Sequence, residues 1–522
     1  MVKIKIRVNL PVFLRKSSGY NLSSKERTGY LYFRTEEKKV KIYSKILTLF
    51  ISLLLLSCKA NESDVGPDPP APAGIGIAKV WLTRGDKSKL LNHEADLTIY
   101  SEESSTWPVI QVDTFTTYQT IDGFGAALTG SSAWLLHRKM SDGARQTALR
   151  KLFDTVNGAG ISYLRLTIGA SDFSLSDFTY NDLPAGRTDF PLQHFTMSRD
   201  TEDVIPMLKE ILQISPSIKF MGSPWSPPAW MKTNENLKGG KLKTDCYDVY
   251  ADYFVRYIRQ MKNLGIGISS VTPQNEPLFS TANYPCMEMQ ATEQAAFIKN
   301  NLGPKFQTAG IQTSIIVYDH NWDNTNYPVS ILDDQGARTY IAGSAFHAYA
   351  GDVSAMSTVH NVHPDKGVYF TEISGGAWAT DFGSNLMWNM KNIFIGTTRN
   401  WSKCALLWNL ALDQNYGPTN NGCNNCRGVV TINASSGQVT FNEEYYSIAH
   451  FSKFVRPGAF RISATQPQAL SNLGTVAFKN PDGSKTLVVC NYGAMLQTFA
   501  VKQGGKNYSY SIPAQSVVSV VW

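Results

Sequence analysis

The segment that decides the fold is Val271-Thr272-Pro273-Gln274-Asn275-Glu276-Pro277. It places a carboxylate, with an amide just before it, where a short apolar run ends. A second segment, residues 367–374, has the same form and carries Glu372. Carboxylates that end two short β-prone segments indicate a parallel barrel, in which the strand ends face one pocket. Such a pair can hydrolyse a glycosidic bond, one carboxylate as acid and base and the other as nucleophile.

The sequence around these segments predicts an α/β fold, a (β/α)8 TIM barrel. Between about residues 119 and 412, short apolar runs alternate with amphipathic stretches such as 250–264, where apolar side chains recur every three or four positions. Eight strand–helix units make such a barrel. A doubly wound open sheet is the alternative, but the glycine-rich phosphate loop expected there does not occur. The predicted strands are 120–124, 162–168, 218–222, 269–273, 314–318, 342–347, 368–372 and 405–410.

The segments on either side of the barrel read as strands without helices. Before it we predict strands at 78–82, 97–100 and 109–115, and after it at 475–478, 486–490, 498–501 and 516–522. We expect the two flanks to join into one β-sandwich. The domain assignment is therefore a β-sandwich from residues 77–118 plus 438–522, and a catalytic barrel from residues 119–437.

The N-terminal residues have the pattern of an export signal. Lys41 and Lys45 precede an apolar run, 46–56, which is too short to span a bilayer and has the length of a signal-peptide core. The run ends Leu55-Leu56-Ser57-Cys58, which resembles a bacterial lipobox with Cys58 as the lipidated residue. We assign residues 1–57 to the signal region and the Pro-rich residues 58–76 to a lipidated tether. A plain secretory signal or a short anchor helix is the alternative, and we expect the true start near Val40.

These features predict an exported bacterial envelope lipoprotein that meets the membrane only through its anchor. Residues 1–58 carry a balance of +9, so the formal net charge of +7 becomes −2 without them. A near-neutral body gives no reason to expect nucleic-acid binding, and we expect a monomer.

Apart from Cys58, six cysteines remain, which allow 15 pairings. For Cys423 and Cys426 a loop disulfide is the better interpretation than a zinc site.

Several motifs resemble glycoside hydrolase family 30, which includes glucosylceramidases, β-1,6-glucanases and related xylan enzymes. They occur in the order of that family and cover the chain from about residue 119 to its end. They are residues 122–129, 164–166 with 171–174, 223–234, the two glutamate segments and 407–412. The resemblance implies that Glu276 is the acid and base and that Glu372 is the nucleophile.

Physical chemistry agrees with a retaining mechanism if the two carboxyls lie about 5–5.5 Å apart. We then expect a raised pKa for Glu276, in part through the charge of Glu372. Arg165 lies inside an apolar strand, where burial without a partner is costly, so we predict that it pairs with Glu372. Asn275 should form a hydrogen bond with the sugar 2-OH.

The resemblance also implies further substrate contacts. Asp172, Trp225 and Trp408 match positions that hold the terminal glucose, and Trp suits that role because its flat ring packs on C–H surface. His347 and Tyr349 match a pair near the nucleophile. The sequence has no HExxH, no paired metal-ligand spacing and no phosphate loop, so we expect no metal and no cofactor.

The predicted substrate is a β-glucan, with β-1,6-glucan favoured over glucosylceramide. Loops 319–326 and 413–421 are rich in Asn, Asp and aromatic residues, whereas a lipid would need an apolar landing surface. Residues 422–430 also resemble the β-1,6-glucanase branch of the family. Glucosylceramidase or another β-glycosidase is the alternative. A catalytically silent surface glycan-binding lipoprotein and a structural cell-wall protein are more remote, because neither needs two catalytic carboxylates.

Overall fold

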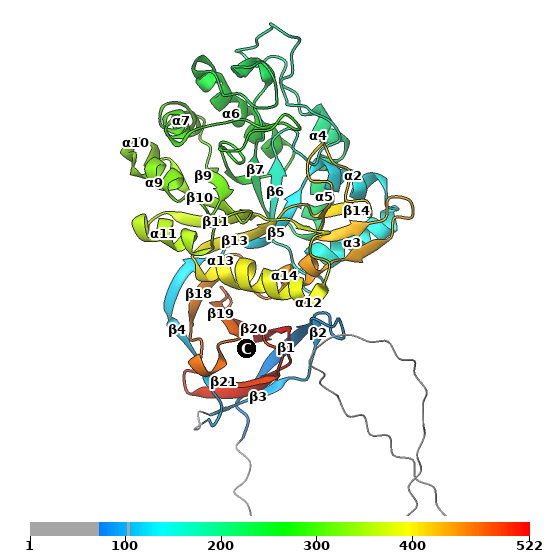
Figure 1. Ribbon diagram of the computed structural model, residues 1–522, viewed down its shortest axis with the longest axis vertical. Coiled ribbons are helices and arrows are strands. Elements are labelled where there is room, and N and C mark those ends of the chain that lie inside the picture. Colours follow the sequence, from blue (N-terminus) through cyan, green and yellow to red (C-terminus); the bar gives the residue numbers. More distant parts are fainter. Residues whose placement is uncertain (1–72, 102–104) are drawn as a thin grey trace, which may run out of the picture. The chain divides into compact units, whose positions relative to one another are not determined.

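The structure is a computed structural model that describes residues 73–101 and 105–522 (Figure 1). The predicted signal region, the lipidation residue Cys58 and the tether as far as residue 72 lie outside the described residues. Within the described ranges, no helix has both the length and the apolar character that a membrane crossing requires.

Eight parallel strands close into a barrel, so the predicted (β/α)8 fold is confirmed. The ring closes where β13 pairs with β5, the last barrel strand with the first. Helices such as α3 (Asp142–Phe153), α5 (Val204–Ile214) and α6 (Tyr247–Asn263) lie between the strands in sequence and surround them in space (Figure 1). The barrel strands are β5 (Gly123–Leu128), β6 (Tyr163–Thr167), β7 (Lys219–Ser223), β8 (Ile268–Val271), β9 (Ser314–Asn321), β10 (Ile341–His347), β11 (Gly367–Glu372) and β13 (Ser402–Leu407).

The first and the last barrel strand are each shifted by three residues at one or both ends from their predicted bounds. The first was predicted at 120–124, but Thr120 ends β4 (Val109–Thr120) and the barrel strand begins at Gly123. The last was predicted at 405–410, but it ends at Leu407 because Asn409 adopts a left-handed backbone with φ of 68°. A strand cannot continue through that conformation. The turn carries Trp408 out of the strand and into the cleft described below.

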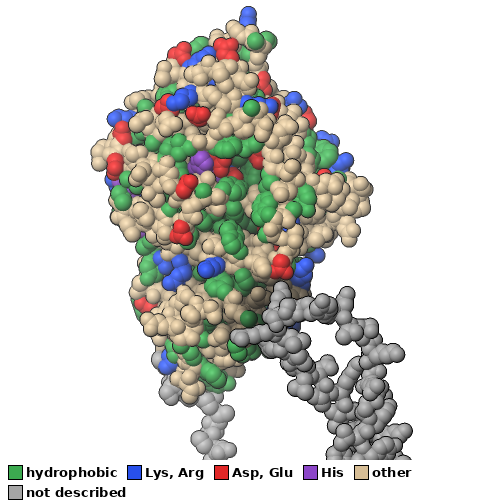
Figure 2. Space-filling view, viewed as in Figure 1, with side chains coloured by type: hydrophobic (Ala, Val, Ile, Leu, Met, Phe, Trp, Pro, Cys, Tyr) green, Lys and Arg blue, Asp and Glu red, His purple; other side chains and the backbone are tan. Residues whose placement is uncertain are grey.

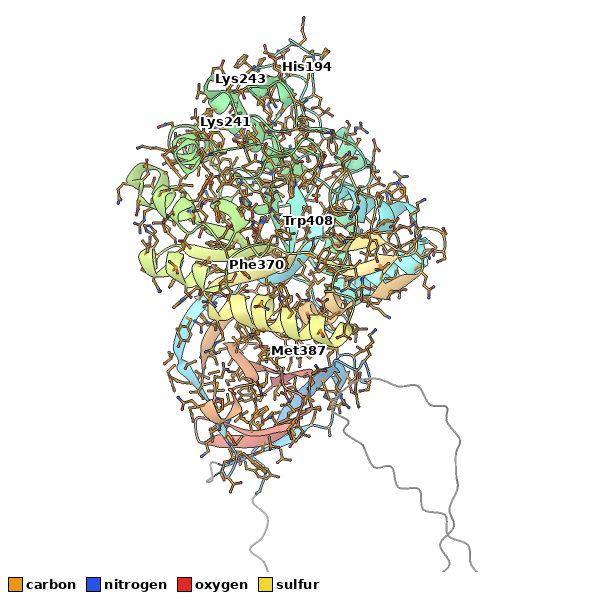
Figure 3. All side chains as sticks on the ribbon, viewed as in Figure 1. His194, Lys241, Lys243, Phe370, Met387 and Trp408 are labelled. Carbon is orange, nitrogen blue, oxygen red and sulfur yellow. A yellow bond between two sulfur atoms is a disulfide. The ribbon has the colours of Figure 1, made fainter. Side chains whose placement is uncertain are left out.

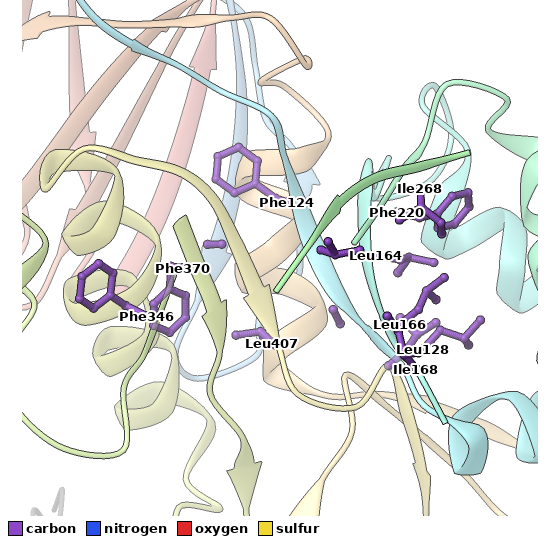
Figure 4. Packing of buried hydrophobic residues seen from close by; sticks show 14 of the residues in the cluster. Phe124, Leu128, Leu164, Leu166, Ile168, Phe220, Ile268, Phe346, Phe370 and Leu407 are labelled. Carbon is purple, nitrogen blue, oxygen red and sulfur yellow. The ribbon is translucent and has the colours of Figure 1, made fainter. Parts of the chain in front are cut away.

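Alternation of side chains along each strand sets the layers of the barrel. On β6, Leu164 and Leu166 point outward and belong to the cluster between strands and helices, together with Phe220 (Figure 4). Tyr163 points inward and belongs to a small apolar cluster that fills the barrel interior. Arg165, two residues further along the strand, therefore also points inward, one layer closer to the C-terminal ends of the strands.

Ten further strands form a β domain from both flanks, as predicted. β1 (Gly76–Arg84) pairs with both β23 (Ser516–Val521) and β3 (Leu97–Ser101), so the ten-stranded sheet folds back on itself. Its two layers enclose a separate apolar core. The other strands of this domain are β2 (Asn92–His93), β4, β18 (Phe460–Ala464), β19 (Leu473–Lys479), β20 (Lys485–Asn491), β21 (Gln497–Gln503) and β22 (Lys506–Ile512).

Helix α14 (Glu443–Ser452) joins the two domains, because it packs against β5 of the barrel and β23 of the sandwich. Its fully buried His450 bonds through Nδ1 to Ser519 Oγ at 2.8 Å and through Nε2 to Thr83 Oγ1 at 2.8 Å. Both partners are neutral, and burial lowers the pKa of His450 to about 3. The side chain is therefore a neutral imidazole at ordinary pH.

We expect His450 to make the protein less stable in acid. The unfolded chain takes up the proton near pH 6.5 and the folded chain near pH 3, so only the unfolded state is protonated between these values. The stabilisation that neutral His450 contributes to folding is complete above pH 6.5. As the pH falls from 6.5 towards 3, the free energy of unfolding decreases by about 1.4 kcal/mol per pH unit. A His450→Gln variant should show a shallower dependence of the urea midpoint between pH 6.5 and 4. An unchanged dependence would contradict the assignment.

Candidate active site

A cleft opens at the C-terminal ends of the barrel strands, with a volume of about 850 Å³. In Figure 2, hydrophobic side chains on this face surround a group of acidic side chains and a histidine. Two of the residues predicted for the site, Arg165 and His347, are fully buried. The other seven all line the cleft: Asp172, Trp225, Asn275, Glu276, Tyr349, Glu372 and Trp408.

The backbone after β8 presents Glu276 in an unusual conformation. Glu276 has a φ of 44°, in the left-handed region that residues other than glycine seldom adopt. Two hydrogen bonds hold the segment, from Asn275 N–H to Pro224 O at 2.8 Å and from Glu276 N–H to Asp319 O at 3.0 Å. Backbone in such regions costs about 1–3 kcal/mol and is found mainly at functional sites. Backbone contacts to the segments that follow β7 and end β9 therefore hold Glu276 in this conformation at the cleft.

The two glutamates lie close together. One carboxylate oxygen of Glu276, one of Glu372 and a ring nitrogen of His347 all lie within 4.8 Å of one another. Inverting glycosidases hold their carboxyls about 6.5–9.5 Å apart to leave room for a water, whereas retaining enzymes hold them about 5–5.5 Å apart. A separation this short between the nearest oxygens matches the retaining geometry, in which one carboxylate attacks the sugar directly.

Arg165 donates hydrogen bonds to Glu372 and to two other buried polar side chains. Its Nη1 donates to Glu372 Oε2, and its Nη2 donates to Asp319 Oδ2 at 2.7 Å and to Asn275 Oδ1 at 2.7 Å. The structure thus brings Arg165 and Glu372 into contact. Because a guanidinium only donates, the Asn275 oxygen must face it, which leaves the Asn275 Nδ2 hydrogens for a ligand in the cleft. This orientation fits the predicted hydrogen bond to a sugar hydroxyl.

Asp319 is the central residue that sequence reasoning missed. It is fully buried and also accepts hydrogen bonds from Thr371 Oγ1 at 2.7 Å and Thr272 Oγ1 at 2.8 Å. Burial opposes its ionisation, but Arg165 and His347 outweigh burial and hold the pKa of Asp319 far below its ordinary value. The sequence placed it in a loop after a strand 314–318, whereas β9 continues to Asn321. A carboxylate near the end of an apolar strand, the signal that found Glu372, also applies to Asp319.

His347 bridges the carboxylates. Its Nδ1 lies 2.9 Å from Glu276 Oε1 and its Nε2 lies 3.1 Å from Asp319 Oδ1. Ionised carboxylates only accept, so both ring nitrogens donate and the ring is an imidazolium. Burial alone would lower the pKa of His347, but Glu372, Asp319 and Glu276 outweigh burial and raise it to about 9. The resemblance placed His347 near the nucleophile, and the structure shows that its hydrogen bond goes to Glu276.

This contact reverses one expectation about Glu276. Burial raises the pKa of both glutamates, but for Glu276 the hydrogen bond and charge of His347 outweigh burial and hold its pKa below the ordinary value. For Glu372, burial prevails over His347 and Arg165 and holds the pKa above the ordinary value. We predicted a raised pKa for Glu276, in part through the charge of Glu372, and that prediction left out the imidazolium. The two carboxylates compete for protons, so the pH dependence of activity belongs to the pair.

A His347→Gln variant should shift the pH–rate profile to higher pH. Removing the imidazolium takes a cation away from both carboxylates, which raises their pKa values by about one to three units. The acid limb of kcat/KM, where the nucleophile must ionise, and the basic limb, where the acid must keep its proton, should both move upward. The measurement is kcat/KM against pH on an aryl β-glucoside. Limbs at the wild-type positions would show that His347 does not set these pKa values.

Two stacked tryptophans form another part of the cleft wall. The rings of Trp225 and Trp408 stack with centroids 4.9 Å apart (Trp408 is labelled in Figure 3). Asp172 lies beside them, and its buried Oδ1 has no hydrogen-bond partner among the described residues. Burial and the charges of the two glutamates raise its pKa well above the ordinary value. Tyr349 Oη donates to Glu372 Oε1 at 3.0 Å.

The predicted loop disulfide is confirmed. Cys423 and Cys426 are bonded and both line the cleft, next to Gly422, where an added Cβ would come within 2.5 Å of the Asp172 Cβ. The loop therefore packs tightly behind Asp172. The other cysteines of the described chain, Cys246, Cys286, Cys404 and Cys490, are free and buried.

Sequence reasoning also missed most of the rim of the cleft. Aromatic and polar side chains there come from the end of a strand, from a helix and from several loops, and no single periodicity connects them all. The nearest available signal was the frequency of Trp and Asn in the segments after the glutamates. The residues concerned are Phe279, Tyr284, His320, Trp378, Trp388, Asn385 and Asn389.

Comparison with known proteins identifies what this site is similar to. The family description "Glycosyl hydrolase family 30 TIM-barrel domain" matches residues 121–455, and "Glycosyl hydrolase family 30 beta sandwich domain" matches residues 458–520. The chain is 36% identical to an endo-1,6-beta-D-glucanase neg1 of Aspergillus fumigatus over 447 residues, which covers 80% of this chain and 88% of the relative. It is 27% identical to a putative glucosylceramidase 1 of Caenorhabditis elegans, which covers 89% and 92%.

A solved structure agrees with these sequence matches. The endo-beta1,6-glucanase BT3312 superposes with a TM-score of 0.80 at 36% identity, which covers 86% of this chain and 99% of that one. At this identity and coverage the likeness extends over both the barrel and the β-sandwich.

Proposed function

This chain belongs to glycosyl hydrolase family 30, a family of retaining glycosidases, and we propose that it is an endo-β-1,6-glucanase. The observation that carries the proposal is the chemistry of the cleft lining. Aromatic rings and amides dominate it, and among the described residues there Ile373 is the one aliphatic side chain larger than alanine. Aromatic rings stack on sugar C–H surface and amides bond hydroxyls, whereas acyl chains need an aliphatic surface. Similarity to two endo-1,6-glucanases at 36% identity also supports it.

The geometry supports double displacement. The reactive form of the pair is the one in which Glu276 holds the proton and Glu372 is ionised. In that form Glu372 attacks the anomeric carbon while the proton of Glu276 passes to the glycosidic oxygen, so the glycosidic bond breaks and a glycosyl ester with Glu372 forms. Glu276 then accepts a proton from water, whose oxygen attacks the same carbon and releases Glu372. Asn275 donates to the sugar 2-OH in both steps, and Arg165 stabilises the Glu372 carboxylate each time it is released.

Substrate hydrolysis tests the proposal directly. The purified protein is incubated separately with a linear β-1,6-glucan, a linear β-1,3-glucan and glucosylceramide, and the products are separated by chromatography. We expect a ladder of oligosaccharides from the β-1,6-glucan, since endo action cleaves inside the chain. Release of glucose from glucosylceramide without oligosaccharides from the glucan would overturn the proposal in favour of a glucosylceramidase. Binding without turnover of any substrate would indicate a silent glycan-binding protein.

We also propose that the enzyme is an exported envelope lipoprotein anchored through Cys58. The lipobox-like sequence before Cys58 supports this location, and so does the Cys423–Cys426 disulfide, because disulfides persist in oxidising compartments. A Cys58→Ala variant should move from the membrane fraction to the soluble fraction. Mass spectrometry of the mature N-terminus should find a lipid-modified cysteine at position 58. A mature start upstream of Ile46 would contradict the proposal.

A further inference from the structure

We propose that the wall of the cleft built from helix α12 (Phe382–Trp388) and the loop before it is a second glucosyl-binding subsite. It would hold a sugar unit other than the one whose anomeric carbon faces Glu372. The inference rests on the proposed glucanase function and adds to it the residues that would make the enzyme prefer long chains. They are Trp378, Trp388, Asn385 and Asn389, with Glu443 behind them.

Trp378 is an exposed aromatic ring with a fixed orientation. It lines the cleft with 57% of its surface exposed. A Cβ added to Gly376 would come within 2.1 Å of the Trp378 ring, so the indole lies directly on the glycine backbone. Only glycine permits this contact. A ring that is both exposed and fixed offers a flat surface for a sugar ring at little further cost in side-chain entropy.

Helix α12 and the π-helical turn that continues it from Asn389 present three more polar or aromatic side chains to the same cleft. Asn385, Trp388 and Asn389 are three and four positions apart, so they share one helix face, and all line the cleft. Trp388 is 44% exposed. The neighbouring Met387 points the other way, toward the sandwich (Figure 3), where its sulfur lies 3.6 Å from Cys490 Sγ. The sandwich contact therefore fixes which face of the helix meets the ligand.

Buried Glu443 orients the two amides. Its Oε2 accepts from Asn385 Nδ2 at 3.0 Å and from Asn389 Nδ2, and both asparagines are more than nine-tenths buried. With the nitrogens turned inward, the two amide oxygens are the atoms left to accept hydrogen bonds from sugar hydroxyls. Burial and the charge of Glu444 raise the pKa of Glu443 to about 8. The arrangement is the same in both protonation states, because a proton on Oε1, beside Ser447, leaves Oε2 an acceptor.

The experiment compares a long and a short substrate. The readout is the ratio of kcat/KM for a β-1,6-linked glucose hexamer to kcat/KM for 4-nitrophenyl β-glucoside. Trp378→Ala and Trp388→Ala should each lower this ratio about tenfold, the effect of losing one stacked ring. Trp107→Ala removes an equally exposed tryptophan from the sandwich and should leave the ratio at the wild-type value. Ratios within twofold of wild type in both cleft variants would overturn the inference.

Glu443 is tested as a positioning residue. Glu443→Leu removes the acceptor and should lower the same ratio about tenfold, whereas Glu443→Gln keeps an oxygen for the asparagines and should restore it to within about threefold of wild type. A merely structural role would lower activity on both substrates alike and leave the ratio unchanged, which would overturn this part of the inference.

An error in the proposed function would give a different experimental result from an error in the subsite. A wild type that hydrolyses the aryl glucoside and not the hexamer would remove β-1,6-glucan as the substrate. The subsite is then decided by titration calorimetry of the hexamer against the inactive Glu372→Gln protein. Weakening of about tenfold on adding Trp378→Ala supports the subsite, and equal binding or no binding overturns it.

Discussion

A Glu372→Gln variant should lose at least about 10⁴-fold in kcat on an aryl β-glucoside, because the amide cannot form the glycosyl ester. The fold should survive the change. Arg165 keeps its contact with Asp319 at 2.7 Å, so it is not left as an unpaired buried charge. The glutamine oxygen can still accept from Arg165 or Tyr349. Steady-state kinetics and thermal unfolding of the two proteins measure both parts.

Covalent labelling locates the nucleophile independently. A 2-fluoro-glucoside with a good leaving group should trap the ester on Glu372 in the wild type, seen by mass spectrometry of the peptide that contains it. The exposed Glu202→Gln serves as a matched control and should keep wild-type kinetics. Near-normal turnover by Glu372→Gln, or a label on another residue, would refute the assignment.

The activity of a Glu276→Ala variant should depend strongly on the leaving group of the substrate. General acid catalysis contributes about 10²–10⁴-fold, so oligosaccharides, whose leaving alkoxide needs the proton, should lose that factor in kcat/KM. Dinitrophenyl β-glucoside needs no proton for departure and should keep most of its kcat/KM. Because the variant also lacks the base for the second step, the glycosyl enzyme should accumulate, and a burst of phenol should precede slow turnover.

Azide separates this role from a structural one. It attacks the glycosyl enzyme without base assistance, so it should raise kcat of Glu276→Ala and yield β-glucosyl azide. The removed side chain also leaves space beside His347, which lies 2.9 Å from Glu276 Oε1 in the wild type. Equal losses on substrates with good and poor leaving groups, with no azide product, would show that Glu276 is not the acid and base.

The sequence was sufficient to predict those features that depend on the pattern of neighbouring residues. Both catalytic glutamates end short apolar segments, and each of the eight predicted barrel strands overlaps an observed one. Arg165 could be paired with a carboxylate because an arginine in an apolar strand needs one. The identity of all its partners could not be predicted in this way. Asp319, Asn275 and Glu372 come from three different strand ends, and only the closed barrel brings them to one guanidinium.

The directions in which the pKa values of the two glutamates shift could not be predicted from the sequence either. They depend on which carboxylate receives the His347 Nδ1 hydrogen, and that contact is set by the rotation of one ring between β8, β9 and β10. The cleft wall at Trp378 was missed for a similar reason. Its position depends on a glycine two residues earlier that lets the ring lie on the backbone. Glycine is common in loops because it suits many turns, so its presence there does not predict a ring packed on it.

The pairing of β1 with β23 has a consequence for synthesis. The ribosome makes β1 first and β23 last, more than 430 residues later, and the two strands share six register positions. The whole barrel emerges between them and can close before the last strand exists. Until then β1 has an unpaired edge on the side that β23 will cover, and such edges promote aggregation. A nascent chain that stalls before residue 516 should therefore contain a closed barrel with an exposed, aggregation-prone N-terminal strand, to which a holdase chaperone would bind.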